Sequence, residues 1–408
     1  MNQPTYNEAR LPNDRIQSLD LLRGIAVLGI LIMNIQSFAM ISAAYSNPFA
    51  FGELSGIHKV VWWFNQLVAS EKFINIFSML FGAGVILLYE RKKQQGAHPW
   101  KVQLRRNFWL FFFGLTHAYL IWYGDILVTY SLCGVFVFLF RDFSSKKLFW
   151  IAGAFFLVPV LLALQQYSEV RDWTSSVVHA NLMAWQPSPD HVTKEVAAVH
   201  GSYIELIKHW LPILKYEHTQ HFAKFYFWRV SAMMFLGMAL YKTGVLTASK
   251  PAVFYKRLIF IGLPLGMLLS IVGIRQNYEH QWAMEYSMIV GYLYNLFGSI
   301  PSSLAYIGIV MLIAISTRMA GFKASMTSTG KMAFTNYILT SILCGFIFYG
   351  YGLGLFGKLE RFGQFMVVIG VWSLLILFST LWLKRFYYGP LEWLWRYLTY
   401  GKKPPFRR

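Results

Sequence analysis

The sequence has 408 residues, of which 56% are hydrophobic and 18% aromatic, and it carries a net charge of +19. Its mean hydropathy of +0.43 and its apolar runs of about 18–22 residues exclude a soluble enzyme and predict an all-α, polytopic membrane protein. The basic residues fall mainly in every second segment between apolar runs. This is the positive-inside pattern, so the charge indicates orientation in the membrane and no nucleic-acid partner.

Ten apolar runs are each long enough to cross the hydrocarbon as a tilted helix. The alternating basic segments, of which the first runs from Arg10 to Arg23, place both termini in the cytoplasm. We therefore predict one integral-membrane domain over residues 1–408, with about ten spans, in the bacterial inner membrane. The first span is expected to stay as an anchor, since no cleavable signal peptide precedes it. The predicted spans are residues 21–41, 71–89, 107–122, 125–140, 147–166, 224–241, 258–274, 292–317, 331–350 and 364–384.

Three segments are predicted to lie outside these spans. Residues 57–69 are too short to cross and are expected to lie in the outer interface or to re-enter the membrane. Residues 167–223 form a long external segment with apolar residues at helical spacing, typical of an amphipathic helix on the outer face. Residues 386–408 mix Trp, Tyr and Arg, which predicts a tail on the cytoplasmic surface. The apolar positions of the external segment are Ile204, Ile207, Trp210, Leu211 and Leu214.

No metal site is expected from the sequence. Cys133 and Cys344 lie inside apolar runs, so neither a disulfide framework nor a thiolate site is indicated. The external His218 and His221 have the i,i+3 spacing of one edge of a metal site, but they lack a third ligand.

Two polar side chains lie deep in apolar sequence. Asn34 is about thirteen residues from the inner start of its span, which places it about 20 Å into a core about 30 Å thick. His117 lies about six residues before the Tyr123–Gly124 turn, or about 9 Å below the outer face. The counts place both in one layer. Polar groups at this depth indicate a functional site, and the alternative is a plain hydrogen bond to a neighbouring helix.

Asp125 begins the next span directly after Gly124. Its structural role would be an N-cap that accepts the free N–H groups of the first turn. Its functional role would be to orient His117 or to bind a polar substrate. The residue count places Asp125 about one turn away from His117 in height, which argues against a direct bond between them.

Charged residues cluster at the inner ends of the first spans. Asp20 and Arg23 form an i,i+3 pair that fits a helix start, and an anionic cofactor is the alternative partner. The basic residues after the second span are explained by the positive-inside rule or, alternatively, by phosphate binding. The candidate cofactor-binding residues are Asp20, Arg23, Arg91, Lys92, Arg105 and Arg106.

Several motifs together resemble the bacterial YeiB-like membrane family, over nearly the whole chain. They are the stretch from Ser18 to Asn34, the hairpin from His117 through Asp125 to Tyr130, Asn336-Tyr337, Gly352-Leu-Gly-Leu-Phe-Gly357, and the ending from Tyr388 to Tyr400. The resemblance implies a multi-pass helical fold.

The N-terminal third is also similar, more distantly, to transmembrane acyltransferases of the heparan-alpha-glucosaminide N-acetyltransferase type. These proteins pass an acetyl group from cytoplasmic acetyl-CoA to a sugar across the membrane. They share the Asp20-x-x-Arg23-Gly start and an active-site asparagine at the place of Asn34. A histidine soon follows that asparagine in the relatives, whereas here the next one is His58. The resemblance therefore implies that His117 supplies the imidazole.

The leading hypothesis is a membrane acyltransferase that moves an acyl group from cytoplasmic acyl-CoA, foremost acetyl-CoA, to a hydroxyl or amine on the outer side. His117 would be the general base, Asn34 the oxyanion donor and Asp125 the residue that positions the acceptor. The alternatives are a transporter or permease for a small solute or lipid, and a non-catalytic membrane sensor. The expected partners are membrane lipids and an acyl acceptor in the cell envelope, and the sequence is compatible with a homodimer.

Overall fold

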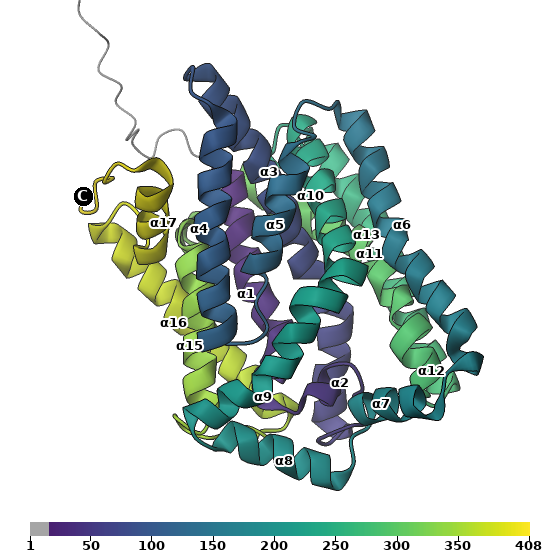
Figure 1. The fold of residues 1–408 in the computed structure, drawn as a ribbon. Coiled ribbons are helices and arrows are strands. Elements are labelled where there is room, and N and C mark those ends of the chain that lie inside the picture. Colours follow the sequence, from purple (N-terminus) through teal and green to yellow (C-terminus); the bar gives the residue numbers. More distant parts are fainter. Residues whose placement is uncertain (1–15) are drawn as a thin grey trace, which may run out of the picture.

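The computed structural model describes residues 16–408, and the part of the first basic segment before Ile16 lies outside the described residues. Within that range, the protein is an all-α, multi-pass membrane protein, as predicted (Figure 1). Its helices are α1 (Gln17–Ala39), α2 (Gly56–Phe64), α3 (Lys72–Gln94), α4 (Pro99–Leu120), α5 (Leu127–Phe138), α6 (Ser145–Glu169), α7 (Ser175–Trp185), α8 (Pro189–His200), α9 (Tyr203–Tyr216), α10 (Phe227–Lys242), α11 (Ala252–Glu279), α12 (Met284–Tyr286), α13 (Leu293–Ile315), α14 (Ala320–Lys331), α15 (Ala333–Phe348), α16 (Arg361–Arg385) and α17 (Pro390–Tyr400).

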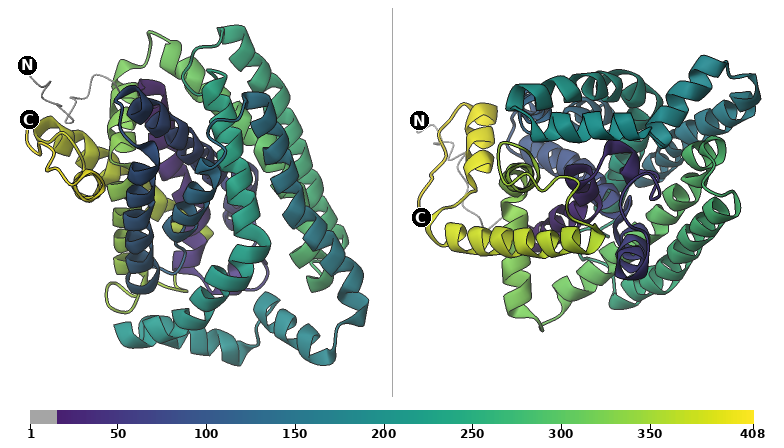
Figure 2. Two further views of the ribbon diagram at one scale, coloured as in Figure 1. Left: turned by 45° about the horizontal axis from the view of Figure 1, so that its top comes forward. Right: turned by 90° about the horizontal axis from the view of Figure 1, so that it is seen from below.

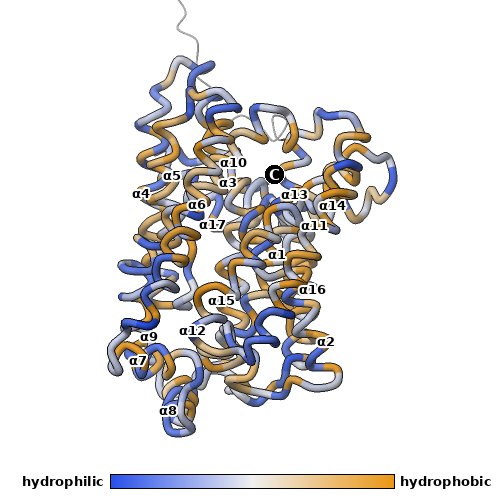
Figure 3. Tube along the Cα trace, turned by 90° about the vertical axis from the view of Figure 1, so that its right-hand side faces the viewer, coloured by the Kyte–Doolittle hydropathy of each residue, from blue (hydrophilic) through white to orange (hydrophobic). Residues whose placement is uncertain are grey.

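Each of the ten predicted spans coincides with a helix, but not every helix is a span by itself. Among the described residues, six helices are long and apolar enough to cross a membrane, or up to seven if the bent pair α14–α15 counts as one span. α4 is not among the six, and α5 and α10 have only 12 and 16 residues. Hydrophobic residues follow the long helices, and hydrophilic residues gather toward the two ends of the molecule (Figure 3).

α1 is the central helix of the bundle. In its most apolar window 83% of the residues are buried, against 28% in α11 and in α16. α1 packs on α3, α13, α14, α15 and α16, and it lies inside the bundle when the molecule is seen from below (Figure 2). A polar residue on α1 is therefore surrounded by protein, whereas the outer faces of α6, α11 and α16 are exposed.

Several pairs of helices cross closely at glycines, α11 and α13 among them. A Cβ on Gly24 or Gly330 would collide with the backbone carbonyl of the facing helix where α1 crosses α14, and Gly82 and Gly237 make the same approach where α3 crosses α10. Small residues let helix backbones approach closely in membranes, where packing replaces the hydrophobic effect as the driving force.

The segment 57–69 corrects one prediction. It forms α2 and a π-helical turn (Asn65–Ala69) that continue into α3 as one candidate span of 39 residues, Gly56–Gln94. These 39 residues correspond to about 58 Å of helix, roughly twice the thickness of the hydrocarbon core, so the α2 end extends beyond it. The helix is interrupted at Ser70 and Glu71, where Glu71 has a left-handed backbone, and α3 continues beyond this break. The segment is therefore joined to a candidate span and not separate from it.

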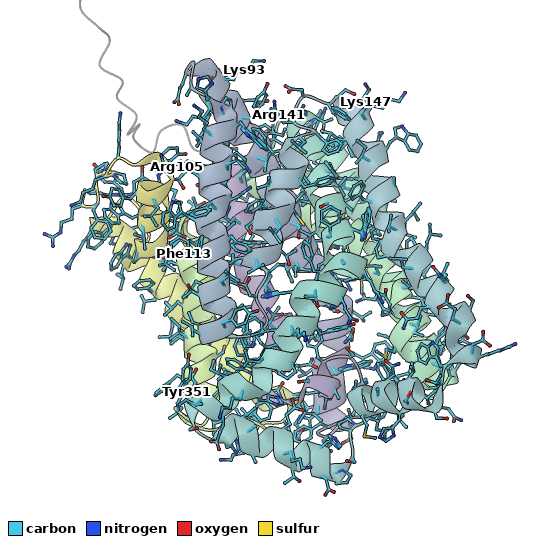
Figure 4. The ribbon with its side chains drawn as sticks, in the orientation of Figure 1. Lys93, Arg105, Phe113, Arg141, Lys147 and Tyr351 are labelled. Atoms are coloured by element: carbon cyan, nitrogen blue, oxygen red, sulfur yellow. The ribbon has the colours of Figure 1, made fainter. Side chains whose placement is uncertain are left out.

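The external segment consists of three short helices, α7, α8 and α9, at the end of the bundle opposite Lys93, Arg141 and Lys147 (Figures 1 and 4). The apolar face of α9 is formed by Leu206, Trp210 and Leu214, which are all buried. Ile204 and Leu211, which we predicted on this face, are 65% and 44% exposed because the burial follows an i,i+4 line that starts at Leu206.

The tail packs against the bundle through α17. Glu392 accepts hydrogen bonds at the start of α15 from the backbone N–H of Phe334 (2.7 Å) and of Thr335 (3.0 Å). α14 and α15 meet there at an angle of 81°, and Asn336 donates to the carbonyl of Thr329 across the break (3.0 Å). The tail carboxylate therefore satisfies the free N–H groups at the first turn of α15.

We predict that Gly237→Ala destabilises the protein by about 1–3 kcal/mol, the usual cost of overpacking a tight contact. The added methyl group would push α10 away from the Met79 carbonyl on α3. The measurement is the thermal unfolding midpoint of the purified protein in detergent.

The matched control is Gly370→Ala, because a Cβ at Gly370 on α16 meets no atom within 4 Å. Equal midpoints for the two variants would contradict the close crossing of α3 and α10.

Candidate functional site

His117 lies in the last turn of α4. The chain then reverses direction, and this brings Asp125 back to the height of His117 in the bundle. The backbone N–H groups of Ile121 and Trp122 both donate to the carbonyl of His117, at 2.9 and 2.8 Å, and this ends the helix. His117 Nδ1 lies 2.7 Å from Asp125 Oδ2, and neither side chain is exposed. The predicted lack of a direct bond was wrong, because the residue count assumed a helix up to the turn and ignored the return of the chain.

Asp125 has two structural partners, one for each carboxylate oxygen. Oδ1 accepts from the backbone N–H of Val128 at 2.8 Å, in the first turn of α5. Oδ2 faces His117. The capping role and the orienting role, which we had set out as alternatives, thus belong to the same side chain.

The second imidazole nitrogen contacts a residue that sequence reasoning missed. His117 Nε2 lies 2.9 Å from Ser341 Oγ on α15, and Ser341 is buried. Because Nδ1 faces a carboxylate, we assign the proton to Nδ1, which leaves Nε2 to accept the hydroxyl proton of Ser341. Asp125, His117 and Ser341 then form the chain of carboxylate, imidazole and hydroxyl found in acyl-transfer enzymes.

A small cavity lies against Ser341. Its volume is ≈ 10 Å³, which is room for about one water molecule. Half-buried Asn34 of α1 lines it, and within residues 16–408 its amide makes no hydrogen bond to another residue. The structure thus brings Asn34 and Ser341 to one cavity, and His117 meets that cavity through Ser341. The other lining residues are Val27, Ile30, Leu31, Phe38, Trp122, Tyr337 and Thr340.

The candidate cofactor-binding residues lie at the ends of α1, α3 and α4 that are predicted to face the cytoplasm. Arg23 is paired with Asp20 at 2.7 Å. The other contacts run mainly to the tail: Arg105 donates to the carbonyl of Leu398 (3.1 Å), the Arg106 guanidinium lies 4.9 Å from the Trp395 ring, and Lys92 Nζ lies 4.8 Å from the Tyr400 ring. Arg91 lies in the last turn of α3. The basic residues therefore surround α17, and Figure 4 shows Arg105 beside the tail.

A larger cavity of ≈ 660 Å³ lies between α7, α8, α9 and the short 3₁₀ helix Ser42–Tyr45 that follows α1. Glu195 Oε1 accepts from the backbone N–H and the hydroxyl of Ser42, at 2.8 and 2.7 Å, and lies 3.8 Å from His209 Nε2. After the predicted topology, we call this space the outer vestibule. Lys194, Lys208 and His191 also line it.

Burial raises the pKa of Glu195, but the interaction with the nearby His209 imidazole and the hydrogen bonds from Ser42 outweigh that effect and hold its pKa below the usual range. The ionised form therefore fixes α8 to the end of α1. Neither Glu195 nor Ser42 stood out in the sequence, because both lie among many polar residues of an external segment.

The external His218 and His221 contact other side chains. His221 Nδ1 lies 2.9 Å from Glu217 Oε2, and His218 Nδ1 lies 3.5 Å from the Tyr119 hydroxyl. Within residues 16–408 no three His, Cys, Asp or Glu side chains gather in a way that could hold a metal ion.

A second buried polar network lies between α3, α10 and α13. Arg229 forms an ion pair with Glu71 and donates to Asn75 at 2.9 Å. Lys72 is fully buried and donates to the carbonyl of Gln66 (2.8 Å) and to Asn295 (2.6 Å). The sequence signal was present, since all three charges lie in predicted spans, but their partners are far away in the sequence.

Comparisons with known proteins assign the family. A family model described as "Protein of unknown function (DUF418)" matches residues 240–402. "Uncharacterized protein YeiB" of Escherichia coli (strain K12) is 32% identical over 399 residues, which is 95% of this chain and 96% of that protein. The chain belongs to the DUF418 family.

Two further relatives extend the match. "Uncharacterized protein YxaH" of Bacillus subtilis (strain 168) is 32% identical over 410 residues, covering 98% of this chain and 96% of the relative. An "Uncharacterized 39.9 kDa protein in amylase 3'region" of Bacillus acidopullulyticus is 25% identical over 400 residues, covering 96% of each chain. The predicted YeiB-like family is confirmed. The DUF418 match contains Ser341 and Glu392, whereas Asn34, His117 and Asp125 precede it.

We predict that acid loosens the outer vestibule. The lowered pKa of Glu195 means that its contribution to stability is present above the unfolded-state pKa of about 4.3 and is lost as the pH falls through the folded-state value. Hydrogen exchange of α8, corrected for the intrinsic effect of pH, should therefore accelerate at about pH 4 and below.

Glu195→Gln should weaken the protection of α8 at neutral pH and remove most of its dependence on acid. Asp190→Asn, on an exposed position of the same helix, should keep both. Protection of α8 that is equal in acid and at neutral pH in the wild type would contradict the role of Glu195.

Proposed function

We propose that the protein is a bacterial inner-membrane acyltransferase that moves an acyl group from cytoplasmic acyl-CoA to a hydroxyl or amine acceptor on the outer side. The observation that carries the proposal is the buried chain of Asp125, His117 and Ser341 beside the cavity of Asn34. A neutral imidazole held by a carboxylate suits proton transfer, and an unpaired amide suits a developing oxyanion.

The inner end offers groups for the nucleotide of acyl-CoA. Arg23, Lys92, Arg105 and Arg106 would supply positive charge for its phosphates, and the aromatic rings of α17 lie among these side chains. In this proposal acetyl-CoA is a substrate that arrives from the cytoplasm. The tail would form part of its binding site.

The outer vestibule is the proposed entrance for the acceptor. Its volume of ≈ 660 Å³ falls in the range of about 300–1,000 Å³ that is usual for small-molecule sites. α9, which lines the vestibule with Glu205, Lys208 and His209, packs with Trp210 on the hairpin that carries His117: the Tyr123 ring is 5.7 Å from the Trp210 ring and 5.8 Å from that of Trp122. The Trp122 ring in turn lies 6.2 Å from the imidazole of His117.

One observation favours the alternative of a transporter. α14 and α15 are broken by an 81° bend, and broken helices commonly hold substrates or ions in transporters. However, Glu392 already occupies the N–H groups at the start of α15. These N–H groups at the start of α15 are therefore not available to bind an anionic solute. We retain the acyltransferase as the leading proposal.

We predict that His117→Ala lowers the rate of acyl transfer about 10²–10⁴-fold and Asn34→Ala about 10²–10³-fold, through loss of the base and of the oxyanion donor. Asp125→Asn should keep the cap on α5 and still lose activity, because the amide no longer holds the imidazole proton. The assay is transfer of label from radiolabelled acetyl-CoA to cell-envelope extract by purified protein in nanodiscs.

Thr116→Ala is the matched control. Thr116 precedes His117 on α4, is exposed and bonds only to its own helix. This mechanism is refuted if the wild type transfers no more label than empty nanodiscs do, or if His117→Ala transfers label as fast as the wild type. The transporter would then be the better proposal.

The proposal also requires about ten spans with both ends inside. Lys93, Arg141 and Lys147 lie at the end of the bundle opposite α8 (Figure 4), as the positive-inside rule expects. Single cysteines at the exposed positions Lys101 and Lys403 should be protected from an impermeant maleimide in intact spheroplasts, and one at Thr193 should react. The native Cys133 and Cys344 are buried. Labelling of Lys101→Cys or Lys403→Cys in intact spheroplasts would overturn the topology.

A further inference from the structure

The hydroxyl of Ser341 differs from several other helical hydroxyls of the bundle, including that of its neighbour Thr340. Ser and Thr side chains in helices usually bond the carbonyl four residues earlier. Thr340 does so at 2.7 Å, Ser303 at 2.7 Å and Ser78 at 2.9 Å. Ser341 lies 3.5 Å from the corresponding carbonyl of Tyr337 and only 2.9 Å from Nε2 of His117. From these distances and the tautomer assigned to His117, we assign the Ser341 proton to the imidazole rather than to its own helix.

We propose that Ser341 is the nucleophile of the protein and that acyl transfer passes through an ester on its Oγ. This inference rests on the proposed acyltransferase function and goes beyond it, since His117 alone could also activate the acceptor directly. The hydroxyl lies where the base can take its proton, and the base is held by Asp125 at 2.7 Å. Ser341 also lines the cavity to which Asn34 presents its unpaired amide.

The first half-reaction consumes acyl-CoA. Ser341 Oγ attacks the thioester carbonyl carbon while its proton passes to Nε2 of His117, and the Asn34 amide donates to the carbonyl oxygen as it gains negative charge. The bond from the carbonyl carbon to sulfur then breaks. The CoA sulfur takes the proton from His117 and leaves as the thiol, and the acyl group remains as an ester on Ser341.

The second half-reaction delivers the acyl group. The acceptor gives its hydroxyl or amine proton to Nε2 of His117, and its oxygen or nitrogen attacks the ester carbonyl. The bond from the carbonyl carbon to Ser341 Oγ breaks, and Oγ recovers the proton. No oxidant, reductant or metal is needed.

A covalent intermediate suits a protein whose two substrates come from opposite sides. The basic residues around α17 lie toward one end of the bundle, and the outer vestibule lies at the other (Figures 1 and 4). With an ester on Ser341, CoA can leave before the acceptor arrives.

The test is to trap the ester. Full-length protein in nanodiscs is incubated with radiolabelled acetyl-CoA without an acceptor, quenched in acid and digested, and the peptide with residue 341 is analysed by mass spectrometry. We expect an acetyl group on Ser341 that disappears when envelope extract is added. His117→Ala should slow its formation about 10²–10⁴-fold.

Two variants test the position. Ser341→Ala should carry no label, and Ser341→Cys should carry a thioester that neutral hydroxylamine cleaves far faster than the native ester. Ser373→Ala is the matched control, because Ser373 is an exposed helical serine bonded to its own carbonyl of Ile369 at 2.9 Å. It should be labelled like the wild type.

The outcomes separate the two proposals. If the wild type transfers acetyl to the extract without label on Ser341, or if Ser341→Ala transfers equally fast, transfer is direct and the ester is refuted while the acyltransferase stands. If the wild type neither becomes labelled nor transfers acetyl, both proposals fail.

Discussion

The buried bond between Asp125 and His117 is the interaction on which the site depends. Burying a carboxylate inside a membrane protein costs free energy unless its oxygens accept hydrogen bonds. Asp125 meets this condition, because Oδ1 accepts from the Val128 N–H and Oδ2 faces His117. The geometry requires α4 and α5 to lie close together. Gly114 allows it, since a Cβ there would come within 2.6 Å of the Val128 nitrogen. Helix capping and imidazole orientation are thus one constraint.

The third member of the site comes from the other half of the chain. Ser341 is 224 positions away from His117, and its place depends on how α15 begins after the bend. Glu392 fixes that beginning, and α17 is itself held to α4 by the indole of Trp395, which donates to the Arg106 carbonyl at 2.9 Å. The tail that resembled a surface anchor therefore links α15 to α4, the two helices that carry Ser341 and His117.

The sequence predicted this site in part, and the reasons are physical. Asn34, His117 and Asp125 were identifiable because a bilayer makes isolated polar groups in apolar runs costly. Ser341 was not, because a serine in a membrane helix usually bonds its own backbone, and only the contact distance distinguishes it from Thr340. The bond between Asp125 and His117 was missed since residue counting measures height along a helix and not the return of a loop.

α1 connects the parts that the proposed reaction uses. Arg23 lies at its inner end in a pair with Asp20, Asn34 lines the cavity, and Ser42, three residues past its end, donates to Glu195 in the outer vestibule. About 16 Å of helix separate Arg23 from Asn34 at 1.5 Å per residue. Because α1 is enclosed by five other helices, it holds these three places at fixed distances from one another. In the proposed reaction, this burial would keep the basic groups, the cavity and the vestibule at a constant spacing for substrates that arrive from opposite sides of the membrane.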